Sequence, residues 1–237
     1  MNNRAMYFHP LLVGLPATQR AALAKASHLR FYKRNDQILL AGESTDQVYC
    51  VGSGLLRAVI PGRVVGSEVT TEFFRPNEFV CDVPISYNRY MSVQTVVAAL
   101  PSTVYLVPIA VMRDLCATHP GVAVGLLGLA MKRMDLLRLH LQHVQALSAQ
   151  DLVCRILHQL TDLAPAGASC YDKRITQAVI ASYSGLSREV VNKTMREFEN
   201  RGLVRRDEDG IYVADYAQVP VHTSPASARI DSRMSSL

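Results

Sequence analysis

The sequence predicts an α+β protein in which a β-rich first half is joined by one long helix to a small helical domain that ends in a hairpin. Short β-rich runs separated by turn residues fill residues 31–109, and an almost continuous apolar helix pattern follows at 121–146. Two short helical patterns separated by a glycine, then a hairpin pattern, occupy residues 175–213. The predicted units are residues 1–120, 121–147 and 148–219, followed by a Ser-, Pro- and Arg-rich tail, 220–237, that is expected to be disordered.

The first half has the sequence pattern of an antiparallel β domain. Turn signals such as Gly52-Ser53-Gly54 and Pro76-Asn77 recur about every ten residues, with no helical pattern between them. This pattern favours a β-sandwich or barrel over a parallel α/β sheet. The expected strands are QVYCV, LLRAVI, EVTTEFF, VQTVVAAL and TVYLVPI. A short helix is expected before them at residues 16–27, with Leu23 on its apolar side.

The helix predicted at 121–146 is apolar on more than one face, and such a helix must be covered on two sides. The β domain can cover one side. A helix from a second copy of the chain is expected to cover the other, which predicts a homodimer. A wholly intramolecular core helix is the alternative. The predicted dimer interface is a stripe at three-to-four-residue spacing that contains Leu127, Met131, Met134, Leu137, Leu141 and Val144.

The residues after 147 predict three further helices. Asp151 is expected to cap the first of them, which stops at Pro165. Thr176 and Ser187 are expected to cap the second and third. Gly185 is expected to form the tight turn between these two, because glycine adopts a left-handed backbone at low cost.

The third helix is expected to be amphipathic and to lead into a hairpin. Gly202 is expected to end it, and Asp209-Gly210 suits a type I′ turn between two short strands. Its buried face is predicted to contain Val191, Met195 and Phe198. Helix, tight turn, helix and two-stranded wing together indicate a winged helix-turn-helix, whose second helix enters the DNA major groove.

Charge supports a nucleic-acid partner for this region. The chain has a net charge of +5, and residues 173–206 contain eight Lys or Arg against three Glu. Arginine can bind guanine O6 and N7, and glutamate can accept from cytosine N4, so Arg188 and Glu189 predict sequence-specific readout of double-stranded DNA. The candidate DNA-contacting residues are Thr176, Ser187, Arg188, Glu189, Asn192, Lys193 and Arg196, with Lys173, Arg174, Arg205 and Arg206 as candidates for phosphate contact.

From about residue 10 to 216 the chain resembles the CRP/FNR family of bacterial transcription regulators. The closest match is ITQAVIASYSGLSREVVNKTMREFENRGLV, and DQILLAGESTDQVYCVGSGLLRAVI and DLVCRILHQLTDLA also resemble the family. The resemblance implies a cyclic-nucleotide-binding-like β-roll (a jelly roll), a long dimerisation helix and a winged helix-turn-helix, with RNA polymerase as a further partner. Ser187, Arg188 and Glu189 match the recognition helix of the cyclic-AMP-receptor branch, and Lys193 replaces its later arginine. A TGTGA-like half-site is thereby implied.

The effector region departs from the family pattern. The Gly-Glu pair that grips a cyclic nucleotide's ribose is replaced by Cys81-Asp82, and the Arg-Ser pair that holds its phosphate is missing. The candidate effector-binding residues are Asp82, Arg89 and Ser92, with Arg89 as a substitute cation from a rearranged loop. Cyclic AMP in the usual pose is not expected, because a buried phosphate would lack a counter-charge. Cyclic di-GMP, another small effector, and effector-free constitutive binding stay open.

Other function classes fit the sequence less well. A cupin-like enzyme would need histidine ligands on its barrel, and residues 31–109 contain no histidine. A haem or redox sensor using Cys81 or a histidine stays open, whereas the cysteine spacing excludes an iron–sulfur cluster or a zinc site. A protein-interaction module with a nonspecific basic end is the third alternative. No signal peptide or bilayer-length apolar run is present, so a cytoplasmic protein without a membrane partner is expected.

Overall fold

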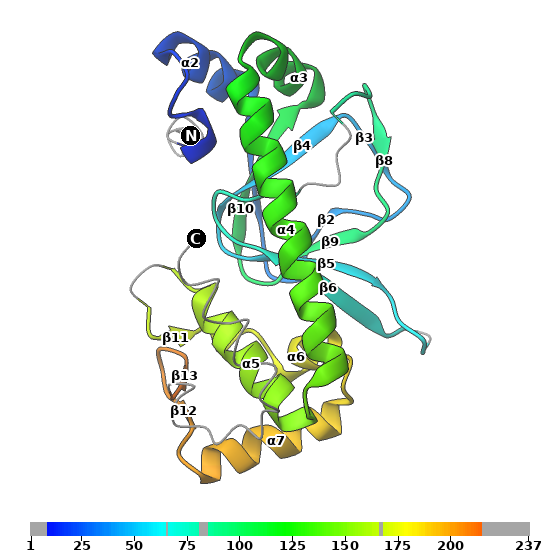
Figure 1. Cartoon of the computed structure of the whole chain (residues 1–237), viewed down its shortest axis with the longest axis vertical. Coiled ribbons are helices and arrows are strands. Elements are labelled where there is room, and N and C mark those ends of the chain that lie inside the picture. The colour runs from blue at the N-terminus through cyan, green and yellow to red at the C-terminus, as the bar shows by residue number, and fades with distance from the viewer. Residues whose placement is uncertain (1–8, 65, 81–84, 166–167, 215–237) are drawn as a thin grey trace. The chain divides into compact units, whose positions relative to one another are not determined.

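The structure, a computed structural model, describes residues 9–64, 66–80, 85–165 and 168–214. These residues form two compact units, each shown in Figure 1. The roll unit contains the described residues up to Ala146 together with Arg174–Leu186, and the helical unit contains Leu147–Lys173 and the described residues from Ser187 onward. The boundaries expected at 120, 147 and 219 stay predictions, and the tail at 220–237 lies outside the described residues.

The roll unit contains two four-stranded antiparallel sheets and a two-stranded pair, as a jelly roll requires. One sheet has the order β1 (His28–Tyr32), β10 (Ser102–Pro108), β4 (Gln47–Ser53) and β7 (Phe79–Val80). The other has the order β2 (Gln37–Leu39), β9 (Thr95–Ala98), β5 (Leu56–Pro61) and β6 (Glu68–Phe74), and β3 (Ser44–Thr45) pairs with β8 (Tyr90–Met91). The five strands predicted from sequence correspond to β4, β5, β6, β9 and β10 and are confirmed.

Cross-strand pairs show where the core of the roll lies. Leu56 pairs with Phe74 on β6 and with Ala98 on β9, and all three side chains are fully buried. The turn before β5 depends on Gly54, whose φ is 85°. A Cβ there would lie 2.3 Å from the carbonyl oxygen of Pro101, so only glycine fits.

The helices of the roll unit are η1 (Pro10–Leu12), α2 (Ala17–Ala26), α3 (Ile109–Thr118), α4 (Pro120–Ala146) and α6 (Gln177–Ser184). The predicted first helix is confirmed as α2, with Leu23 buried. Figure 1 shows α4 running along the roll, and Leu126 and Leu129 pack against its core. In the described part of the chain no single helix is long and apolar enough to span a bilayer; α3 and α4 reach that length only together, bent by 116°.

A neighbouring side of α4 carries an exposed apolar stripe. Leu127 is 62% exposed and Leu141 is 57% exposed, and Met131, Met134, Leu137 and Val144 are exposed as well. The roll thus covers one side of α4 only, which confirms the first half of the two-sided prediction.

The helical unit contains α5 (Ala149–Asp162), α7 (Arg188–Asn200) and a small antiparallel sheet of order β11 (Cys170–Tyr171), β13 (Ile211–Val213) and β12 (Val204–Arg206). Its core joins one face of each helix to the sheet. The fully buried side chains include Val153, Leu157, Tyr171, Val191 and Met195. Val191, Met195 and Phe198 were predicted as the buried face of α7, and this is confirmed.

Two local predictions in the helical unit are wrong. The N-cap of α5 is Ser148, whose Oγ accepts the backbone N–H of Asp151 at 3.2 Å, so Asp151 lies inside the first turn. The wing turn is not type I′, because neither Asp209 nor Gly210 has a positive φ. Asp207 forms the turn instead, since its Oδ1 accepts the N–H groups of Asp209 and Gly210.

His9 ties the first described residues to the roll. Its Nε2 donates to the Asn77 carbonyl at 2.8 Å and its Nδ1 accepts the Leu11 N–H at 3.1 Å, which is the bonding of a neutral ring. Burial lowers the pKa of His9, and the hydrogen bond to Asn77 offsets this in part.

Because the unfolded state takes up a proton on His9 more readily than the folded state, stability falls on acidification. The contribution of His9 is complete above about pH 6.5 and is lost as the pH falls below it. We expect chemical denaturation of His9→Gln to show about 1 kcal/mol less stability at pH 7 and a weaker dependence between pH 7 and 5.5. The exposed His28→Gln is the matched control. Equal pH slopes in the wild type and His9→Gln would contradict this role.

Candidate nucleic-acid interface and effector region

The amphipathic pattern of α7 separates its buried face from a charged one. Ser187 is the N-cap, and its Oγ accepts the Val190 N–H at 3.2 Å. Gly185 precedes it with φ of 73°, and Gly202 follows the helix with φ of 71°, so both predicted glycine positions are confirmed. The first and last turns of α7 are thus fixed by the sequence.

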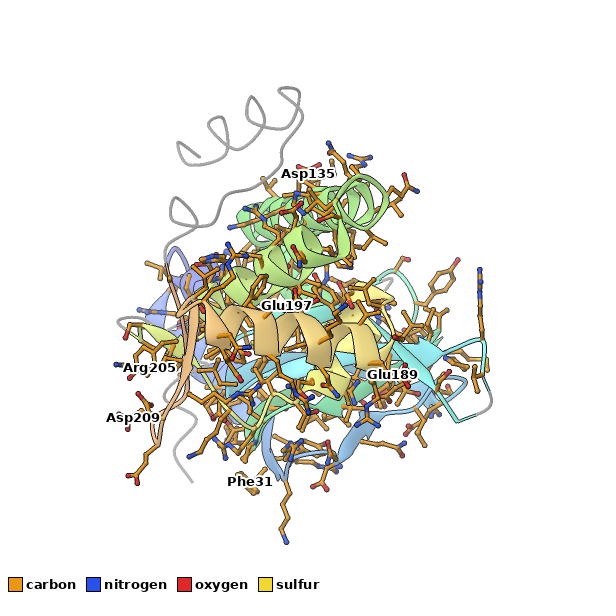
Figure 2. The ribbon with its side chains drawn as sticks, turned by 90° about the horizontal axis from the view of Figure 1, so that it is seen from below. Phe31, Asp135, Glu189, Glu197, Arg205 and Asp209 are labelled. Carbon is orange, nitrogen blue, oxygen red and sulfur yellow. The ribbon has the colours of Figure 1, made fainter. Side chains whose placement is uncertain are left out.

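The exposed side of α7 carries the predicted base-reading residues together. Arg188, Glu189, Lys193 and Arg196 are exposed, whereas Asn192 is half-buried. Figure 2 shows Glu189 near the N-terminal end of α7 and Glu197 farther along it. These side chains offer a guanidinium, a carboxylate and an ammonium within three helical turns, which are the groups that read base edges.

The other acidic side chains of α7 have protein partners, and Glu189 differs from them. Glu197 accepts from Gln150 Nε2 at 2.6 Å, and Glu199 pairs with Arg206. Glu189 makes no ion pair with a described residue. A carboxylate in the first turn also stabilises a helix through its dipole, so Glu189 serves α7 itself as well as any base it reads.

The hairpin beside α7 presents arginines that are already engaged. Arg205 pairs with Asp207 at 3.4 Å and its guanidinium lies over the Tyr212 ring, 4.7 Å from the centroid. Arg206 pairs with Glu199 on α7. Figure 2 shows Arg205 and Asp209 on this hairpin, at one end of α7.

The remaining candidates divide between the two units. Lys173 is in the helical unit, and its Nζ donates to the Glu208 carbonyl at 2.8 Å, next to the wing. Arg174 and Thr176 belong to the roll unit, and both are exposed. Thr176 is the N-cap of α6 by position, although its side chain accepts no capping hydrogen bond.

The three predicted effector residues lie in different settings. Asp82 lies outside the described residues, and Arg89 is exposed. Ser92 is buried, and its hydroxyl donates to the Gln94 carbonyl at 2.6 Å. The structure therefore does not bring these three residues together as a described site.

A largely buried ion pair in the roll unit provides a cation that the sequence did not predict. Arg133 on α4 pairs with Glu72 on β6, and the two side chains are 18% and 12% exposed. Arg133 Nη1 also donates to the Phe79 carbonyl at 2.8 Å, and Gln94 Nε2 donates to Glu72 at 3.3 Å. The guanidinium lies 3.9 Å from the Phe74 ring centroid. The sequence signal was the spacing of Arg133 from Leu126 and Leu129, which places it on the covered side of α4.

Breaking this pair from one side is expected to be costly. Arg133→Met leaves the Glu72 carboxylate buried without its counter-charge, and we expect a loss of about 3 kcal/mol in the free energy of unfolding. Adding Glu72→Gln should restore most of that loss, because the double variant buries no charge. Chemical denaturation of the two variants measures the effect. A double variant no more stable than Arg133→Met would show that packing, not charge, is responsible.

The described residues give little support for a redox-active cysteine or a metal site. Burial raises the pKa of the Cys154 thiol to about 11 and also raises that of Cys116, so both stay protonated near neutral pH. Among the described residues, no three His, Cys, Asp or Glu side chains lie close enough to hold a metal ion. Cys81 lies outside the described residues.

Comparison with known families matches both halves of the chain. Residues 29–119 match the model of the cyclic nucleotide-binding domain, and residues 153–219 match that of the Crp-like helix-turn-helix domain. No curated protein shows significant sequence similarity to the chain.

Solved structures share the fold at low sequence identity. FixK2 from Bradyrhizobium japonicum is 16% identical, with a TM-score of 0.71 over 81% of this chain and 94% of that chain. The c-di-GMP-responsive regulator CLP from Xanthomonas campestris is 16% identical, with a TM-score of 0.67 over 84% of this chain and 100% of that chain. A CooA mutant from Carboxydothermus hydrogenoformans is 14% identical, with a TM-score of 0.64 over 84% and 88%. The two matched domains, in this order and joined by α4, show that the chain belongs to the CRP/FNR family of transcription regulators, which bind DNA and are not enzymes.

Proposed function

We propose that this regulator binds a pseudo-palindromic DNA site as a homodimer and reads each half-site with α7. The observation that carries the proposal is the exposed cluster Arg188, Glu189, Lys193 and Arg196 on one capped helix. The Arg188 guanidinium can donate two hydrogen bonds to a guanine, and the Glu189 carboxylate can accept one from a cytosine, in a half-site of the TGTGA type. Lys193 cannot form the two parallel hydrogen bonds of an arginine guanidinium, so its ammonium group makes a single contact to a purine or a phosphate.

The dimer is supported by the apolar stripe on α4. A stripe of six exposed Leu, Met and Val side chains is costly to leave in water, and its three-to-four-residue spacing suits a parallel partner helix. A two-fold dimer would place two copies of α7 about one DNA turn, ~34 Å, apart. RNA polymerase is the expected second partner at a promoter.

Control by cyclic AMP in the usual pose is not part of the proposal. The cation that α4 provides, Arg133, is already neutralised by Glu72, so a phosphate would have to displace a buried carboxylate. CLP is described as responsive to c-di-GMP, and that ligand, another small effector, or no effector are the alternatives for this chain.

Fluorescence anisotropy tests the proposal. The purified protein is titrated, at one near-physiological salt concentration, against a palindromic duplex with TGTGA-like half-sites and against a scrambled duplex. Preference for the palindrome without a nucleotide indicates an effector-free regulator. If preference appears only with cyclic AMP or cyclic di-GMP, that ligand is the effector. Equal binding to both duplexes under all three conditions contradicts sequence-specific readout of this half-site.

A further inference from the structure

The roll unit contains an apolar cavity that the DNA-binding proposal does not use. Its volume is about 320 Å³, and it lies between the roll and the helices α3 and α4. We propose that this cavity binds a small, neutral, apolar molecule and forms a ligand site separate from Arg89 and Ser92, the two predicted effector residues that the structure describes. Its lining includes Val48 and Val80 from the roll, Met112 and Cys116 from α3, and Leu126 and Ala130 from α4.

The geometry of α3 and α4 explains why this space is left open. The two helices are bent by 116° at their joint, so they diverge as they leave it. Ala123 and Ala130, two turns apart on α4, line the cavity and are too short to fill it. The cavity is partly open to solvent, because Ala123 and Leu127 in its lining are exposed, so a small molecule can enter it.

The lining chemistry selects the ligand class. None of the described lining residues is charged, and the Cys116 thiol is the polar group among them. Burial raises the pKa of Cys116, so this group is a neutral thiol near pH 7. A phosphate or carboxylate placed here would lose part of its hydration without gaining a counter-charge from the described lining residues. The cavity therefore suits an uncharged hydrocarbon-like molecule and not a cyclic nucleotide.

The volume sets the size of the ligand. An apolar cavity of about 150 Å³ stays dry and binds benzene, so 320 Å³ accommodates about twice as much, such as two fused rings or a chain of about ten carbons. Leu127, which is 62% exposed, lines the same cavity from α4. The ligand would thus touch a residue of the predicted dimer stripe, so occupancy and dimerisation share one side chain.

The site is distinct from the polar network described above. Arg133 lies one helical turn beyond Ala130 and is paired with Glu72, and neither residue lines the cavity. Arg89 and Ser92 do not line it either. A molecule in the cavity would therefore meet apolar walls and leave the buried ion pair intact.

Fluorine NMR with fluoronaphthalene tests the site on the full-length protein. We expect saturable binding to the wild type, and no competition from naphthalenesulfonate, which has the same rings and a charge. Ala130→Leu should abolish binding and raise the thermal unfolding midpoint, because leucine fills the void. Ala146→Leu, the same substitution at the exposed far end of α4, should leave binding unchanged.

Several results would overturn the proposal. Absence of saturable binding to the wild type would do so, as would undiminished binding to Ala130→Leu, which would place the probe elsewhere. A lower unfolding midpoint for Ala130→Leu would show that protein atoms already occupy the space. Equal competition by the sulfonate would contradict selection of neutral ligands. DNA is absent from these measurements, so failure of the palindrome experiment would leave their outcome unaffected.

Discussion

Replacing Leu137 and Leu141 on α4 by aspartate is expected to abolish binding to the palindromic duplex while leaving each unit folded. Both side chains are exposed in the chain, so the substitutions remove no core packing. Two carboxylates facing their counterparts across a helix pair would prevent dimerisation. In a dimer, binding of one half-site holds the second copy of α7 near the other half-site at an effective concentration in the millimolar range. A monomer lacks this advantage.

The expected loss of DNA affinity is large because a dimer binds both half-sites at once, whereas a monomer binds only one. A gain of roughly 10² to 10⁴ from bivalency would be lost, which moves specific binding into the range of nonspecific binding. Sedimentation velocity would report a monomer, and anisotropy would report the lost affinity. Lys132→Asp is the matched control, because Lys132 is exposed and lies about 140° around the helix from Leu137. A double variant that stays dimeric would contradict the predicted interface.

Removing the base-reading groups at the start of α7 should give the second largest effect. A bidentate contact is worth about 1–3 kcal/mol of discrimination, and a two-fold dimer makes each contact twice. Arg188→Ala is therefore expected to cost about 2–6 kcal/mol, or roughly 30-fold to 10⁴-fold in affinity for the palindrome. Its affinity for the scrambled duplex should change far less.

Glu189 requires a subtler comparison because it also stabilises the first turn of α7. Glu189→Gln keeps the length of the side chain but removes the charge that favours cytosine N4. We expect selection from a library randomised in the half-site to show lost preference at one G·C pair, with an unchanged unfolding midpoint. Arg205→Ala should instead weaken binding to all duplexes alike. Unchanged preference at every position would assign Glu189 to helix stability alone.

Long periodic elements were predictable from sequence. The α4 pattern over 121–146 differs from the observed helix by one residue, and the caps and glycines around α7 define it locally. The strands β4, β5, β6, β9 and β10 were predicted because each is a run of mainly β-branched, aliphatic and aromatic residues between turn signals. Such elements carry their pattern within one window of sequence.

The features that were not predicted depend on residues that are far apart in the sequence. Strand β7 has only two residues and exists because Phe79 and Val80 pair with β4. Glu72 and Arg133 are 61 residues apart, and only the packing of α4 on the roll brings them together. The wing turn was misread because Asp-Gly suits a type I′ turn locally, whereas the Asp207 carboxylate stabilises a longer loop.

The wing arginines have a consequence for how the protein responds to salt. Arg205 and Arg206 each hold a carboxylate already, from Asp207 and Glu199. A phosphate that replaces such a carboxylate neutralises charge on DNA but exposes a new anion on the protein. Counterions released from the duplex are then partly offset by cations that gather at the freed carboxylates. The dependence of the logarithm of the binding constant on salt should therefore be shallower than the number of arginines facing the backbone suggests.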